Sequence, residues 1–262
     1  VLSLCLILAL LPATAFAQTA APEEETSPPI TVGGVDLEST AANPVAYAIT
    51  DESGNVATEG ANDTNYNVKW DGETLTLRNA TVKVVENEHS AAIERSAPFT
   101  LKLEGRNTLT SLENTHAGKG ISATIEDYGT VDPTVPYALT ICGDGSLDVT
   151  GITEGIALAG NLIIKSGTVT ATATTAQSTY PSFGIGTMEV GNIYIEGGKV
   201  TAIGGASSTF SAGFYIMVMS NENTGQVPGG TVRITGGEVT AVSGEITETD
   251  EEEPVPISPG SF

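Results

Sequence analysis

Two histidines stand in the same four-residue setting at two places in the chain. The segments 86–89 and 113–116 share the pattern Glu-Asn-x-His and lie 27 residues apart. Neighbouring strands of a sheet lie about 5 Å apart, so stacked copies of this segment would bring Glu86, His89, Glu113 and His116 together. Imidazoles and carboxylates are ligands for zinc and similar metals. The alternative is that both segments form the same solvent-exposed corner, with stacked asparagine amides and histidines that face water.

Aromatic residues indicate a different kind of site. Flat rings can stack on the faces of sugars while nearby polar groups fix the orientation of the ligand. Long connections and one outward strand position carry five such residues, namely Tyr180, Phe183, Tyr194, Phe210 and Tyr215. Together they predict a carbohydrate-binding patch. The alternative is that Phe183 and Phe210 pack beneath their own loops as small satellite clusters.

The chain offers little for catalysis on polysaccharides. Hydrolysis needs a pair of carboxylates, and elimination needs a cationic base beside a bound cation. The acidic residues are scattered, and lysines and arginines alternate with Glu104 and Glu196 along one predicted outer face, which is typical of a solvated charge ladder. Motifs of the Ser-His-Asp type and phosphate-binding loops are absent from the sequence. We therefore expect no catalytic residues and no resident cofactor, although calcium or zinc stays open without a specific motif.

The candidate metal-binding and carbohydrate-binding residues must be positioned by a short sequence repeat. It consists of two runs of alternating apolar residues around a corner rich in small residues, and it occurs as LTLRNATVKV (75–84), LKLEGRNTLTS (101–111), LTICGDGSLDV (139–149), LIIKSGTVTA (162–171), IYIEGGKVTA (193–202) and VRITGGEVTA (232–241). A third short segment follows several copies, near Ile93, Ile121, Ile156 and Ile185. A unit of this size cannot bury its own apolar face, so the copies must stack. The pattern predicts an all-β fold, a right-handed parallel β-helix with three strands per coil.

Alternation along each strand assigns the faces. Residues such as Leu75, Leu77, Ile193 and Ile195 are expected to point inward, and the last copy should do the same with Val232, Ile234, Val239 and Ala241. The intervening residues, among them Lys102, Thr140, Tyr194 and Arg233, should form an outward column.

The regions that flank the repeats differ in composition. Residues 1–17 are apolar and end in a small-x-small step, which predicts a secretory signal peptide that lacks its basic start. We expect a disordered leader at 18–29, an N-terminal β cap at 30–70, the parallel β-helix at 71–244 and an acidic, proline-rich tail or linker at 245–262.

Charge narrows the range of partners. The chain of 262 residues carries 32 acidic and 10 basic side chains, a formal net charge of −22. Such a protein repels nucleic acid, so nucleic acid is excluded as a partner. We expect a secreted or cell-surface protein with no membrane insertion after cleavage of the signal peptide, present as a monomer or as part of a longer multidomain chain.

The phrases YNVKWDGETLTLRNATVKV, APFTLKLEGRNTLTS, GGKVTA and GGEVTA carry a family resemblance. From about Ile30 to Gly244 the chain resembles secreted bacterial surface proteins with right-handed parallel β-helix repeats, commonly labelled carbohydrate-binding-domain-containing proteins. The resemblance implies contact with extracellular polysaccharide or with host or cell-surface glycan, and it assigns no ligand residues. The expected function is non-catalytic, carbohydrate-binding or adhesive. A structural stalk or adhesin module without glycan binding, and a polysaccharide lyase or glycoside hydrolase, are the alternatives.

Overall fold

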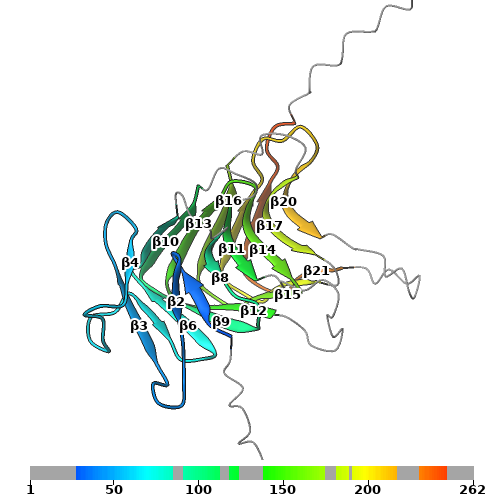
Figure 1. Cartoon of the computed structure of the whole chain (residues 1–262). Helices are drawn as coiled ribbons and strands as arrows, with labels where there is room; N and C mark the ends of the chain where they lie inside the picture. Colours follow the sequence, from blue (N-terminus) through cyan, green and yellow to red (C-terminus); the bar gives the residue numbers. More distant parts are fainter. Residues whose placement is uncertain are drawn as a thin grey trace, which may run out of the picture.

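The computed structural model describes residues 28–84, 91–112, 118–123, 138–174, 181–188, 191–216 and 230–246. The described part is all-β, as the sequence predicts, and its strands form three sheets (Figure 1). The expected signal peptide, most of the leader and most of the acidic tail lie outside the described residues.

From β6 onward, successive strands belong to the nine-, six- and seven-stranded sheets in turn. The nine-stranded sheet contains β3 (Ala46–Thr50), β4 (Val56–Ala57), β5 (Val68–Trp70), β6 (Thr74–Arg78), β9 (Phe99–Glu104), β12 (Ala138–Gly143), β15 (Asn161–Ile164), β18 (Ile193–Ile195) and β21 (Val232–Ile234). The six-stranded sheet contains β7 (Thr81–Val84), β10 (Arg106–Ser111), β13 (Ser146–Gly151), β16 (Thr168–Ala173), β19 (Lys199–Ile203) and β22 (Glu238–Val242). The seven-stranded sheet contains β1 (Ile30–Val32), β2 (Val35–Leu37), β8 (Ala91–Glu94), β11 (Lys119–Ala123), β14 (Glu154–Ala159), β17 (Ser182–Met188) and β20 (Ser211–Ile216).

From β6 to β19 every strand pairs in parallel with the strand three places later in the chain. The third segment of the repeat forms such a ladder, in which Ile93, Ile121, Ile156 and Ile185 are successive partners. Alternation explains the core, because the apolar positions of each strand turn inward and are buried together between the sheets. The residues expected inside at 75, 77, 193 and 195 are fully buried.

Two details of the sequence-based register are wrong. Aligning the repeated phrases placed Leu139 opposite Leu101, but Leu139 pairs with Phe99, and Ile141 pairs with Leu101. The reason is that β9 begins two residues before the repeated phrase, with the buried Phe99. Consequently Lys102 lies beside Cys142, and Thr100 rather than Lys102 shares the outward column of Thr140.

The last copy of the repeat is also less buried than predicted. Val232 and Ile234 pair with Ile193 and Ile195, which are fully buried, yet they are 42% and 52% exposed themselves. They lie on the last strand of their sheet, and among the described residues no further strand covers them.

Antiparallel strands close the opposite end. β3 and β4 pair antiparallel as a hairpin, and β5 pairs antiparallel with both β3 and β6. In the seven-stranded sheet β1 pairs antiparallel with both β2 and β8. Two cations hold these strands against the parallel part: Arg78 lies 3.8 Å from the ring centre of Tyr66, and Arg95 lies 4.4 Å from that of Trp70.

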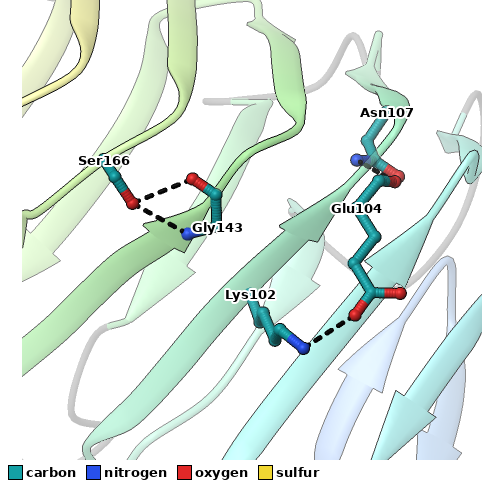
Figure 2. Close-up of polar contacts among 5 residues, drawn as sticks. All are labelled: Lys102, Glu104, Asn107, Gly143 and Ser166. Atoms are coloured by element: carbon teal, nitrogen blue, oxygen red, sulfur yellow. Dashed lines mark hydrogen bonds and ion pairs between the residues drawn. The ribbon is translucent and has the colours of Figure 1, made fainter.

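Polar side chains tie successive copies together at the corners. Buried Asn107 accepts a hydrogen bond from the Ala80 amide at 2.9 Å and donates to the carbonyl of Ser146 at 3.1 Å, so it links β10 to strands on both sides. Figure 2 shows this asparagine donating to the Glu104 carbonyl, beside the ion pair of Lys102 and Glu104. It also shows the Ser166 hydroxyl bonded to both the amide and the carbonyl of Gly143 in the preceding copy. These bonds keep the register of the sheets from slipping.

Candidate functional site

The outer face of the nine-stranded sheet carries a pocket near its last strand. Tyr194 points outward from β18 and pairs in register with Arg233 on β21. Glu196 and Thr235 follow two residues later on the same face of the chain. These four side chains line a hollow of about 190 Å³. In this pocket Tyr194, which the sequence predicts to point outward, lies beside three polar side chains.

A ladder of amides positions the two strands of this pocket. The side chain of Asn161, at the start of β15, accepts from both the backbone amide and the side-chain amide of Asn192 at 3.0 Å. The side chain of Asn192 in turn accepts from the Thr231 amide at 2.9 Å. Asn192 and Thr231 lie just before β18 and β21, so the ladder fixes where the strands that carry Tyr194 and Arg233 begin.

The polar groups of the pocket are available to a ligand. None of the ion pairs between described residues includes Arg233 or Glu196. Both side chains are exposed, whereas Tyr194 is half-buried. Arg233 offers several donors in a planar fork, Glu196 offers carboxylate acceptors, and the Thr235 hydroxyl, which donates to the Ile195 carbonyl at 3.5 Å, can accept. With the flat ring of Tyr194, this set suits a ligand with one apolar face and several hydroxyl groups.

Sequence reasoning assigned Glu196 and Arg233 to a solvated charge ladder. The signal for their grouping with Tyr194 was present, since Tyr194 and Arg233 occupy equivalent positions in consecutive copies. Among the described residues of this predicted ladder, an ion pair is present at its other end, where Lys102 and Glu104 are 2.7 Å apart. There, the hydrogen bond to Glu104 and the attraction of its charge raise the pKa of Lys102.

Three of the other predicted aromatic residues form a separate cluster in the seven-stranded sheet. The rings of Phe183 and Tyr215 stack with centroids 5.0 Å apart, and Phe210 lies 5.2 Å from Tyr215 at a tilt of 50°. Phe183 is only 2% exposed, because its ring lies over Gly186 on its own strand, whereas Phe210 is 43% exposed. Of the other two predicted residues, Tyr194 belongs to a different sheet, and Tyr180 lies outside the described residues.

A buried charge pair lies one strand away from this cluster. Glu154 on β14 occupies the position equivalent to Phe183, and Lys119 on β11 is its partner on the other side. The ammonium and carboxylate are 3.8 Å apart, and Glu154 Oε2 has no hydrogen bond although it is buried. Burial raises the pKa of the Glu154 carboxyl, and the charge of Lys119 opposes this in part. Sequence analysis did not single out this pair.

The metal-binding hypothesis falls on residues that the structure does not describe. Glu86, His89, Glu113 and His116 all lie in the gaps at 85–90 and 113–117. Within the described ranges, no group of three or more His, Cys, Asp or Glu side chains is arranged to hold a metal ion. In the same ranges, no helix has the length and apolar character needed to cross a membrane.

Comparison of the chain with protein-family models, with curated proteins and with solved structures gives no match. The geometry of the pocket is therefore the basis for a functional proposal.

Proposed function

We propose that this protein is a secreted or cell-surface right-handed parallel β-helix that binds carbohydrate without transforming it. The rotation of successive strands through three parallel sheets supports the β-helix. Parallel connections within a sheet are almost always right-handed, which supports the hand.

The observation that carries the binding function is the pocket of Tyr194, Glu196, Arg233 and Thr235. A sugar ring placed on Tyr194 presents its apolar face to the aromatic ring and its hydroxyls to the edge. Glu196 and Thr235 accept hydrogen bonds from those hydroxyls, and Arg233 donates to hydroxyl or ring oxygens. The pocket lies on the outer face of a sheet, which suits one unit of an extended polysaccharide better than an enclosed small molecule.

The same pocket supports binding over catalysis. Glycoside hydrolysis requires two carboxyl groups on opposite sides of the scissile bond. The pocket lining contains a single carboxyl group, that of Glu196. Glu154 belongs to a different sheet and is 7% exposed, so it does not face the same ligand.

A glycan array followed by retention on insoluble polysaccharides tests this proposal. Wild-type protein should be retained, and Tyr194→Ala should weaken retention by roughly 5- to 150-fold, because ring stacking and hydrogen bonding together are worth about 1–3 kcal/mol. Phe210→Ala is the matched control, since it removes an exposed ring from the aromatic cluster of the other sheet. Loss of retention in Phe210→Ala but not in Tyr194→Ala would move the site to that cluster.

Assays for reducing sugar and for unsaturated products on the same polysaccharides separate binding from catalysis. Retention without product is the expected result. Product formation would favour the lyase or hydrolase alternative, and absence of retention on every glycan would favour a purely structural stalk.

A further inference from the structure

The basic side chains of this protein are few, and most of them are already engaged. All ten lie within the described ranges. Six of them contact a carboxylate or an aromatic ring, namely Lys102, Arg106, Lys119, Lys199, Arg78 and Arg95. Among the described residues no such contact is present at the other four, which are Lys69, Lys83, Lys165 and Arg233.

Two of these four cations flank the pocket on the nine-stranded sheet. Arg233 lines the pocket on β21. Lys165 lies on its other side: the Glu196 amide donates to the Ile164 carbonyl at 2.8 Å, so Lys165, which follows Ile164, is the neighbour of Glu196 in the preceding copy. Lys165 and Arg233 are both exposed. Each can therefore reach a ligand that lies across the pocket.

An outward surface connects the two cations. β18 lies between β15 and β21, and neighbouring strands are about 5 Å apart, so the two cations are separated by about 10 Å across the sheet. Ile163 on β15 pairs in register with Tyr194 and points outward beside it. The apolar surface of the pocket thus continues onto β15. A polymer that crosses the three strands would meet a ring and an aliphatic side chain, with a cation at each end.

Charge complementarity indicates what kind of polymer fits this arrangement. Given the glycan binding proposed for the pocket, on which this step rests, we propose that the ligand is an acidic polysaccharide whose sugar units carry carboxylates. The guanidinium of Arg233 binds one carboxylate through its planar fork, and the ammonium of Lys165 binds a second as a point charge. Tyr194 stacks on the sugar ring between them.

The net charge of −22 does not oppose this assignment at the site. Sixteen of the 32 acidic residues lie outside the described ranges. At physiological ionic strength exposed charges farther apart than about 8 Å are largely screened, so the local cations determine the contact. Two cations about 10 Å apart suit carboxylates on separate sugar units, whereas duplex DNA carries a charge about every 1.7 Å along its axis. Glu196 is the one carboxyl group in the pocket lining, and its charge works against an acidic ligand.

Matched polymers test the ligand class. Binding of the full chain to polygalacturonate, alginate and hyaluronate is measured by isothermal titration calorimetry, beside the same polymers with their carboxyl groups methyl-esterified. The quantity of interest is the preference, defined as the ratio of the Kd for the esterified form to the Kd for the acid form. Wild type should prefer the acid form of at least one polymer, and the preference should fall as salt is raised.

Four variants test the assigned residues. Lys165→Gln and Arg233→Gln should each lower the preference by about two- to fivefold, the effect of an exposed ion pair. Glu196→Gln should raise the preference, because it removes a like charge beside the ligand. Lys83→Gln is the matched control, since it removes an equal charge from an outward position of the six-stranded sheet and should leave the preference unchanged. All four residues are exposed, and circular dichroism confirms that each variant is folded.

The outcomes separate this inference from the proposed function. Esterified polymers that bind as tightly as the acid forms would overturn the ligand class and leave glycan binding in place. A loss of preference in Lys83→Gln equal to that in Lys165→Gln, or no loss in Lys165→Gln and Arg233→Gln, would do the same. Failure to bind any glycan would overturn the proposed binding function and the ligand class with it.

Discussion

Replacing Gly198 by alanine probes whether the corners of successive copies stack in register. Gly198 has a φ of +83°, and its equivalents Gly167 and Gly237 have φ values of +91° and +84°. An added Cβ at Gly198 would lie 2.4 Å from the carbonyl oxygen of Gly167 in the preceding copy, well inside ordinary contact. The obstacle is backbone, so a rotamer change cannot relieve it.

Gly60 provides the matched control. It has a φ of +76°, but an added Cβ there meets nothing within 4 Å. Gly60→Ala should cost only the backbone penalty of a left-handed residue, about 1–2 kcal/mol. Gly198→Ala carries the same penalty and forces two stacked corners apart, which adds about 1–3 kcal/mol.

Thermal unfolding followed by circular dichroism measures the difference. For a folded region of this size, 1 kcal/mol corresponds to roughly 2–4 °C in Tm. Gly60→Ala should lower the Tm by about 2–8 °C, and Gly198→Ala should lower it by several degrees more. Equal effects of the two substitutions would show that the corner of Gly198 does not pack against that of Gly167.

Two further predictions concern the core and the buried charge pair. Ile195→Ala should cost about 2–5 kcal/mol in urea unfolding because it leaves a cavity in a fully buried position. Ile234→Ala, at the register partner of Ile195, should cost less than about 1 kcal/mol because the Ile234 side chain is 52% exposed, and equal costs would contradict this difference in burial. Glu154 has its pKa raised by burial in the folded state, so its ionisation lowers stability at neutral pH, and this loss disappears as the pH falls through the folded-state pKa toward the usual 4.5. Wild type should therefore gain stability relative to Glu154→Gln between pH 7 and 4.5, as measured by urea unfolding, and a pH-independent difference would contradict the assigned shift.

Repetition made the fold predictable from the sequence. Apolar residues recur at every second position in each copy, and a strand that fails to turn them inward would expose all of them. For this reason the inward positions at Leu75, Leu77, Ile193 and Ile195 follow from the pattern alone. The register between copies was harder, because Phe99 precedes the repeated phrase and shifts the alignment by two residues.

The site was less predictable than the fold. Tyr194 could be assigned to an outward position because its strand alternates cleanly. The sequence could not predict that Tyr194 lies apart from Phe210 and Tyr215. The three residues are close in the sequence, but the chain turns two corners between Tyr194 and the other two. Nor does alternation reveal that Phe183 is covered, because its ring lies over Gly186, whose lack of a side chain leaves the space.

The burial of Glu154 has a similar cause. In sequence it is an ordinary charged residue that follows a turn, and only the strand pairing shows Lys119 on one side and Phe183 on the other. Its environment depends on three segments that are distant in the chain.

Nuclear magnetic resonance of the protein with a glycan identified on the array tests the central claim most directly. The ring signals of Tyr194, assigned by comparison with Tyr194→Phe, and the Nε–H signal of Arg233 should shift together as the glycan is added. Shifts confined to the rings of Phe210 and Tyr215, with Tyr194 and Arg233 unchanged, would contradict the proposed site.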